Sequence, residues 1–210
     1  MSSTLIALAL AYLLGSVSGS LVLGHFIGVD IRAAGSGNAG GTNALRTRGW
    51  RFALAVVLID IGKGALAAGL AFWLWVPLAP LSAVQLAGAC TLMAAVGHTW
   101  PLYFGFRGGK GAGTLIGGLC VTWPLSVLPV FLVWITSLVL TGYVGLSTVL
   151  AAAVLMPLAF AWAPLQVPFA IAAALFIAFT HRSNLGRLYA GTEHRFERVR
   201  IFRRRQTPVA

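Results

Sequence analysis

Acidic residues are scarce in this sequence. Only 4 of its 210 residues are Asp or Glu, against 15 Lys or Arg, and charged residues make up 9% of the chain. A soluble domain carries about 25% charged residues. The net charge of +11 could suggest nucleic acid as a partner, but a chain that is 59% hydrophobic is too apolar for that class. The composition predicts an integral membrane protein with basic loops on one side, following the positive-inside rule.

The few acidic and sulfur-bearing residues also limit the chemistry. The carboxylates are spread along the chain, at Asp30, Asp60, Glu193 and Glu197. A magnesium-dependent phosphotransferase needs a cluster of them, so we predict no metal site and no cofactor. The two cysteines lie in apolar stretches, where we expect packed thiols and not a disulfide.

Long segments contain no charged residue at all. There is none before Asp30, none between Lys63 and Arg107, and none between Lys110 and Arg182. A membrane-spanning helix needs about 20 apolar residues. We therefore expect one span in 4–27, two in 52–106 and four short ones in 111–181. The breaks are expected near Pro77 and Pro80, Pro124, Thr141–Gly142 and Ala163–Pro164.

The basic clusters set the expected topology. They are residues 32–51, 107–110 and 182 onward, and if all three are cytoplasmic an even number of spans must separate each pair. This predicts an all-α integral membrane protein with seven transmembrane helices, its N-terminus outside and its C-terminus cytoplasmic. We expect a single transmembrane domain over 1–210 with a basic tail from about 195 to 210. The first apolar segment lacks a basic n-region and an A-x-A-type cleavage site, so we interpret it as an uncleaved helix.

The first polar loop, residues 35–46, is rich in glycine. Glycines allow successive backbone N–H groups to point at one anion, and Arg46 adds a guanidinium suited to phosphate. The alternative is a flexible polar linker. A G-x-G-x-x-G match within it is a weak signal because no strand precedes it. The candidate phosphate-binding residues here are Ser36, Gly37, Asn38, Gly40, Gly41, Thr42, Asn43 and Arg46.

A second polar region runs from Gly97 to Pro101 and from Phe106 to Gly111. Its basic, glycine-rich turn precedes a predicted helix, and a helix N-terminus beside a lysine favours anions. It is not a nucleotide P-loop, since glycine follows the lysine where Ser or Thr should bind magnesium. A loop that only sets topology is the alternative. The candidate phosphate ligands are His98, Gly108, Gly109, Lys110 and Gly111.

The third polar cluster is His181, Asn184 and Arg187. On a continuing helix these residues share one face, at the end of the last span. We select His181 and Asn184, with Lys110, as catalytic candidates and Arg187 as a phosphate ligand; for His181, a helix-capping role is equally compatible.

Three more polar residues accompany the spans. Lys63 either forms a neutral pair with Asp60 or extends towards the substrate, and we include it among the phosphate ligands. Ser147 is included too, although a helix-cap role is as compatible with its position.

Two other function classes remain open at this point. A transporter for anionic metabolites would also use basic loops, but it predicts an internal repeat, and we find none. A different acyltransferase class uses H-x-x-x-x-D, and His25 to Asp30 has that spacing.

The motifs together resemble the bacterial membrane acyl-phosphate:glycerol-3-phosphate acyltransferases, over the whole chain and in the same order. The residues that match are the S-G-N-x-G-x-T-N-x-x-R loop at 36–46, D-x-x-K-G at 60–64, G-H-x-x-P at 97–101, F-x-G-G-K-G at 106–111, H-R-x-N-x-x-R at 181–187 and G-x-E at 191–193. The chain departs from the family pattern at Ala39, Gly41, Arg107 and Gly145.

The resemblance implies a function. Such an enzyme transfers a fatty acyl group from acyl phosphate to the 1-hydroxyl of glycerol-3-phosphate, producing lysophosphatidic acid and inorganic phosphate in the first step of phospholipid synthesis. It implies a seven-span protein of the bacterial cell (inner) membrane, with membrane lipid around it and its active site facing the cytoplasm. It also implies the enzyme that forms acyl phosphate as a candidate partner. Ser36, Arg46, Lys110, His181 and Asn184 would line the site.

Overall fold

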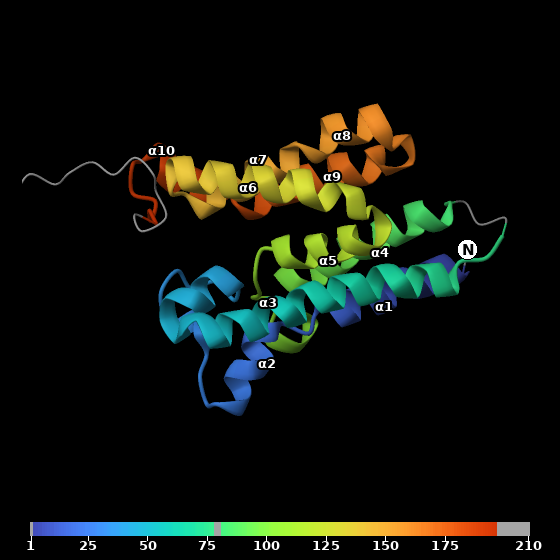
Figure 1. Ribbon diagram of the computed structural model, residues 1–210. Helices are drawn as coiled ribbons and strands as arrows, with labels where there is room; N and C mark the ends of the chain where they lie inside the picture. Colours follow the sequence, from blue (N-terminus) through green and yellow to red (C-terminus); the bar gives the residue numbers. More distant parts are fainter. Residues whose placement is uncertain (1, 78–80, 197–210) are drawn as a thin grey trace, which may run out of the picture.

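The computed structural model describes residues 2–77 and 81–196, and throughout these residues the regular elements are helices (Figure 1). The α-helices are α1 (Ser2–Gly15), α2 (Gly19–Phe26), α3 (Gly41–Leu74), α4 (Ala83–Thr99), α5 (Ala112–Thr122), α6 (Val127–Thr141), α7 (Val144–Ala153), α8 (Leu155–Trp162), α9 (Val167–Thr180) and α10 (Arg182–Tyr189). Short 3-10 turns are η1 (Ile31–Ala33), η2 (Leu102–Phe104), η3 (Pro124–Ser126) and η4 (Pro164–Gln166).

The helices form two layers that follow the chain order. Helices α1 to α5 make the lower layer in Figure 1, and α6 to α10 make the upper one. Within the lower layer α3 packs on α4 and α5, while α9 of the upper layer contacts α4 and so joins the two. Buried Leu115 and Leu119 of α5 share a hydrophobic cluster with Phe169 and Ile177 of α9. The layers therefore have one continuous apolar contact along the bundle.

Glycines allow the helices of the lower layer to approach closely. A Cβ atom on Gly15 would lie 2.1 Å from the carbonyl oxygen of Ala94, and one on Gly64 would lie 1.9 Å from that of Thr114. Small residues at such contacts are typical of membrane helix packing, because lipid tails compete equally well for larger apolar side chains. Backbone proximity at these glycines brings α1 against α4 and α3 against α5.

The expected breaks are found where the structure describes them. Helix α3 ends at Leu74, before Pro77, while Pro80 and the part of the expected basic tail from 197 onward lie outside the described residues. Helix α6 ends at Thr141, where Gly142 adopts a left-handed conformation with φ of 79°. Pro124 and Pro164 each begin a 3-10 turn that precedes the next helix. The first apolar segment is one bent unit, since its two helices meet at an angle of 45°. The carbonyls of Gly15 and Val17 at this bend accept hydrogen bonds from the ammonium of Lys63.

The expected count of seven spans is not confirmed. Among the described residues, three helices are long and apolar enough to cross a membrane, or up to five if each bent pair is one span. Helix α5 has only 11 residues, about 16 Å at 1.5 Å per residue, against a hydrocarbon core of about 30 Å. The apolar composition therefore predicted a longer regular helix in this part of the chain than the 11 residues of α5.

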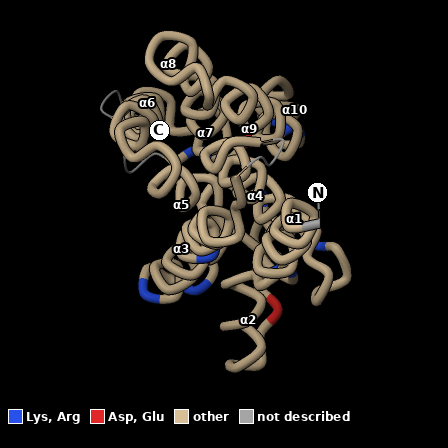
Figure 2. Tube along the Cα trace, turned by 90° about the vertical axis from the view of Figure 1, so that its right-hand side faces the viewer, with Lys and Arg blue, Asp and Glu red and all other residues tan. Residues whose placement is uncertain are grey.

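The three basic clusters meet at one end of the bundle, at the left of Figure 1. Arg32 donates to the carbonyl of Arg107, Lys110 contacts Asn184, and the Arg46 guanidinium lies over the ring of Phe196. Figure 2, turned by 90° from Figure 1, shows Lys and Arg in both helical layers. The shared end agrees with the parity argument, which requires the three clusters to lie on the same side of the membrane.

Candidate active site

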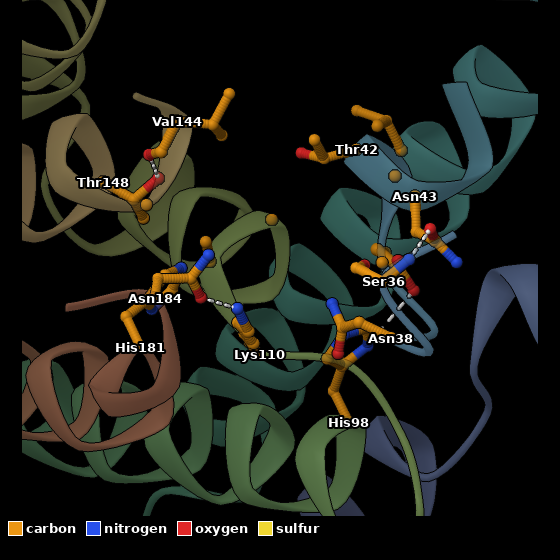
Figure 3. A pocket seen from close by; sticks show the side chains of 18 of the residues that line it. Ser36, Asn38, Thr42, Asn43, His98, Lys110, Val144, Thr148, His181 and Asn184 are labelled. Atoms are coloured by element: carbon orange, nitrogen blue, oxygen red, sulfur yellow. Dashed lines mark hydrogen bonds and ion pairs between the residues drawn. The ribbon is translucent and has the colours of Figure 1, made fainter. Parts of the chain in front are cut away.

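A cavity of about 190 Å³ lies between the two layers at the basic end. Figure 3 shows side chains from both layers pointing into it. It contains twelve of the predicted site residues: Ser36, Asn38, Gly40, Gly41, Thr42, Asn43, Arg46, His98, Lys110, Gly111, His181 and Asn184. The tertiary structure therefore joins parts of all three polar clusters in a single site.

The N-termini of three helices converge on this cavity. Helix α3 contributes Gly41 and Thr42, α5 contributes Ala112 and Gly113, and α7 contributes Val144 and Gly145. The first backbone N–H groups of a helix have no partner within it, and the helix dipole makes that end positive. A cavity that collects several such ends is suited to anions such as phosphate.

Asn43 holds the first glycine-rich loop in shape. Its side-chain amide donates to the carbonyls of Ile31 and Ala34, at 3.0 Å each, and its oxygen accepts from the N–H of Ser36 at 2.8 Å. Both amide hydrogens are thus occupied, and the side chain is buried. Asn43 lines the cavity but has no side-chain donor left for phosphate, so its role fits loop positioning.

The second glycine-rich loop folds back on the end of α4. The N–H groups of Gly108 and Gly109 donate to the carbonyls of Thr99 and His98, at 3.0 Å each. A Cβ atom on Gly109 would lie 2.0 Å from Nε2 of His98, which explains the glycine. Our interpretation that these two glycines offer N–H groups to phosphate is therefore at odds with the structure: neither lines the cavity, and both donors are in use.

Lys110 heads a chain of polar contacts. Its ammonium donates to the side-chain oxygen of Asn184, and the amide of Asn184 donates to Glu193 at 2.6 Å. The other oxygen of Glu193 accepts from Nε of Arg187 at 2.7 Å. Burial, with the nearby charges of Arg187 and Arg46, lowers the pKa of Lys110 to about 8, against the opposing effect of Glu193. Lys110 is therefore protonated at neutral pH and close to titrating.

His181 is buried in the cavity wall with a defined ring orientation. Its Nδ1 lies 2.9 Å from the carbonyl oxygen of Ile177, which can only accept a hydrogen bond. Nδ1 therefore carries the proton, and in the neutral ring Nε2 is left as an acceptor.

Arg46 reaches the cavity from the first turns of α3. Its Nε is buried and has no hydrogen-bond partner within the described part of the chain. Leaving such a donor unpaired is costly, and a substrate phosphate would relieve that cost. Arg46 is therefore placed to bind an anionic ligand in the cavity.

Lys63 lies behind the cavity wall. Besides the two carbonyls at the α1–α2 bend, its ammonium contacts Asp60 at 3.1 Å and Nδ1 of His98 at 2.7 Å. Lys63 is not among the cavity-lining residues, whereas Asp60 and His98 are. The structure thus favours the paired interpretation over the one in which Lys63 extends to the substrate. Nδ1 of His98 also lies 3.3 Å from Oδ1 of Asp60, so Lys63, Asp60 and His98 form one buried polar cluster.

Three other predicted ligands lie off the cavity wall. The N–H of Gly37 donates to the carbonyl of Ala34, the hydroxyl of Ser147 donates to that of Tyr143, and Arg187 pairs with Glu193. Sequence reasoning instead overlooked Gly145, Thr148 and Glu193 as wall residues. The sequence carried a signal for two of them: Gly145 departs from the family's usual serine, and Glu193 ends the G-x-E match at 191–193. For Thr148 the helix register decided, and no motif includes it.

A second cavity, of about 340 Å³, adjoins the first and is lined almost entirely by apolar side chains of α5, α6, α7 and α9. Thr42, Ala112, Gly113, Val144 and Thr148 belong to both walls. The indole N–H of Trp134 donates to the hydroxyl of Thr148 at 3.3 Å, which fixes the aromatic wall. We call this second cavity the apolar groove. A ligand whose polar head occupies the first cavity therefore has space for an apolar tail in the groove.

The structure also bears on the alternative motifs. Asp30 accepts hydrogen bonds from the backbone and guanidinium of Arg32, at 2.8 to 3.0 Å, so it is not paired with His25 as an H-x-x-x-x-D dyad requires. Within residues 2–77 and 81–196, no three His, Cys, Asp or Glu side chains are grouped so that they could hold a metal ion.

Comparisons with known proteins agree with this geometry. The sequence model of a family described as glycerol-3-phosphate acyltransferase matches residues 5–191. A glycerol-3-phosphate acyltransferase of Shouchella clausii is 45% identical over 194 residues, covering 88% of this chain and 91% of the relative. One of Thermus thermophilus is 38% identical over 208 residues, covering 95% and 98%.

Two solved structures share the fold. The crystal structure of PlsY, an integral membrane glycerol 3-phosphate acyltransferase, in its glycerol 3-phosphate form superposes with a TM-score of 0.83 at 33% identity, covering 92% of this chain and 96% of that one. Its lysophosphatidic acid form gives a TM-score of 0.82 at 32% identity, covering 92% and 95%. The present chain therefore belongs to the glycerol-3-phosphate acyltransferase family of integral membrane proteins.

Proposed function

We propose that this protein transfers a fatty acyl group from acyl phosphate to the 1-hydroxyl of sn-glycerol-3-phosphate. The products are lysophosphatidic acid and inorganic phosphate. The observation that carries the proposal is the junction of the two cavities: three helix N-termini, Arg46 and Lys110 surround a polar cavity that continues into the apolar groove. A substrate with a phosphate head and an acyl tail matches both parts. PlsY, the relative with the same fold, has structures in glycerol 3-phosphate and lysophosphatidic acid forms.

The donor end of the site is the wall shared by the two cavities. Thr42, Gly113 and Thr148 lie at this junction. A phosphate held at the starts of α3, α5 and α7 would place the acyl carbonyl at the mouth of the groove, with the chain along α7. Acyl-CoA would need room for its nucleotide, and the loops among the described residues are too short to form a soluble pocket for one.

The chemistry then follows from positioning. The glycerol hydroxyl oxygen attacks the acyl carbonyl carbon, the bond from that carbon to the phosphate oxygen breaks, and the hydroxyl proton leaves with the phosphate or passes to Nε2 of His181. Arg46, Lys110 and the helix N-termini offset the repulsion between two anionic substrates. Lys110, His181 and Asn184 are the proposed catalytic residues, and Ser36, Asn38, Thr42, Arg46 and His98 the proposed substrate ligands.

The proposed setting is a bacterial inner membrane. We propose that the chain is a single domain, that the basic end faces the cytoplasm, where glycerol-3-phosphate is found, and that short or bent helices complete seven passages. Acyl phosphate would arrive from the enzyme that forms it, either directly or through the lipid phase.

The test is phosphate release by the purified protein in lipid. We expect release from acyl phosphate that depends on glycerol-3-phosphate, little turnover with acyl-CoA, and full activity in EDTA because cationic side chains neutralise the phosphates. Equal turnover of acyl-CoA would refute the donor assignment. Loss of activity in EDTA that magnesium restores would instead favour a metal-dependent phosphotransferase.

A further inference from the structure

The chain turns back towards the cavity after α10. The N–H of Gly191 donates to the carbonyl of Leu188, that of Thr192 donates to the carbonyl of Arg187, and Gly191 has φ of 70°, a left-handed conformation that glycine adopts without strain. The next residues, Glu193–Phe196, run beside the cavity instead of away from it. We call residues 193–196 the C-terminal strap.

The strap is attached to the upper layer at two places. Glu193 binds Asn184 and Arg187 of α10, as described above. Further along, Nε of Arg195 donates to the carbonyl of Thr141 at 3.0 Å, and the N–H of Phe196 donates to that of Gly142 at 2.8 Å. These carbonyls belong to the break between α6 and α7. The strap thus joins α10 to the turn from which α7 enters the site.

Phe196 carries the strap across to the lower layer. Its ring lies 4.8 Å from the guanidinium carbon of Arg46, which extends from α3. This distance is within the range of a cation–π contact. The ring of Phe196 is half-buried at the basic end of the bundle. One aromatic side chain therefore connects the C-terminal part of the chain with an arginine of the polar cavity.

The chemistry of this contact suits a phosphate ligand. A carboxylate beside Arg46 would fix the guanidinium but would also neutralise it and compete with the substrate. An aromatic face restricts the guanidinium while leaving its charge and its N–H donors available. Arg46 and Arg187 differ in this respect: Arg187 is paired with Glu193, whereas Nε of Arg46 has no hydrogen-bond partner in the described residues.

We propose that Phe196, held by the C-terminal strap, is a positioning residue for Arg46 and thereby sets the affinity of the polar cavity for a substrate phosphate. The inference rests on the proposed function, because it assigns a phosphate to Arg46. It adds a residue that lies beyond the matched family region, which ends at residue 191.

The test compares Phe196→Leu with Phe196→Trp. Leucine keeps apolar bulk but removes the π face, while tryptophan keeps the face. We expect Phe196→Leu to raise KM for a phosphate substrate about three- to tenfold, with kcat and Tm near those of the wild type, and Phe196→Trp to remain close to wild type. Tyr189→Ala is the matched control, since Tyr189 is 97% exposed at the end of α10.

A double-mutant cycle ties the effect to Arg46. In an Arg46→Gln background, which has no cation for the ring to hold, Phe196→Leu should change KM no further. Wild-type KM in Phe196→Leu, or the same rise in both backgrounds, overturns the proposal.

A second measurement separates this inference from the reaction itself. Inorganic phosphate should raise the Tm of the wild type, and Phe196→Leu should need several-fold more phosphate for the same rise. An inactive wild type whose phosphate response still depends on Phe196 refutes only the proposed reaction. An active wild type whose phosphate response is unchanged by Phe196→Leu refutes only the strap.

Discussion

At the scale of single residues, the site contains few groups with a free charge. Of the cationic side chains near the cavity, Arg187 and Lys63 are paired with carboxylates, while Arg46 and Lys110 line the wall. Motif matching alone gave all four the same role. Burial and hydrogen bonding distinguish those that can neutralise a substrate from those that hold the scaffold.

We predict that Arg46→Ala and Lys110→Ala each lower kcat/KM tenfold or more. Loss of one charge-assisted contact to phosphate costs about 1.5–3 kcal/mol. Arg182→Ala is the control, because Arg182 contacts the carbonyl and ring of Phe179 and does not line the cavity. Steady-state kinetics on folded protein decide this. Near-normal turnover in both variants would leave the loops with a topological role only.

The titration of Lys110 predicts a basic limit of activity. Its pKa is lowered to about 8, mainly by burial, so the ammonium is present below that pH and lost above it. Phosphate binding and protonation of Lys110 favour each other. We therefore expect kcat/KM to fall as the pH rises through about 8. The fall should disappear in Lys110→Arg, whose guanidinium stays charged; an identical profile in that variant would assign the titration to another group.

At the scale of elements, turns and loops position these side chains. The loop that carries Lys110 is anchored at Phe104 and Arg107, whose carbonyls accept from one guanidinium nitrogen of Arg32 at 3.1 and 2.9 Å. Asp30 is paired with the same guanidinium, and the hydrogen bonds from Arg32 lower the pKa of the Asp30 carboxyl. Arg32 belongs to none of the matched motifs. It nevertheless connects the turn before the first polar loop with the second polar region.

We predict that Arg32→Ala reduces kcat/KM severalfold, because the loop loses two anchoring bonds of about 1 kcal/mol or more each. Arg32→Lys should rescue little, since one ammonium cannot reproduce the planar set of contacts. Arg51→Ala, whose side chain lies over the ring of Trp50, serves as the control. Full activity in Arg32→Ala would show that the glycine turns hold the loop unaided.

The apolar groove predicts a chain-length effect. Ala151 lies on the groove wall on α7, about one turn beyond Thr148, the last α7 residue of the polar cavity. Ala151→Phe fills part of the groove, so the variant should prefer shorter acyl phosphates by several carbons. Competition between donors of different length measures this, with Tm as a check on packing. An unchanged length profile in folded Ala151→Phe would move the acyl chain elsewhere.

At the scale of the whole molecule, basic clusters far apart in sequence meet at one end of two helical layers (Figure 1). That juxtaposition makes one site from three loops, so topology and function are linked. A cluster on the opposite face of the membrane would remove part of the site.

We predict that single cysteines at positions 40, 107 and 195 are not labelled by a membrane-impermeant thiol reagent applied to intact cells. All three positions lie at the basic end, which we assign to the cytoplasm. A cysteine in the 81–82 region, at the opposite end of the bundle, is the positive control. Labelling of any of the three basic-end positions would overturn the orientation and the shared site with it.

The sequence by itself determined the apolar, all-helical character, the breaks at Gly142, Pro124 and Pro164, and most of the cavity residues. Charge and helix-breaking residues act locally, so they can be identified without coordinates. Only the tertiary structure decided that Gly108 and Gly109 serve backbone packing, that Lys63 is enclosed, and that Phe196 reaches Arg46. Each of these depends on hydrogen bonds or contacts between segments distant in sequence, and no local pattern encodes which partner a donor will find.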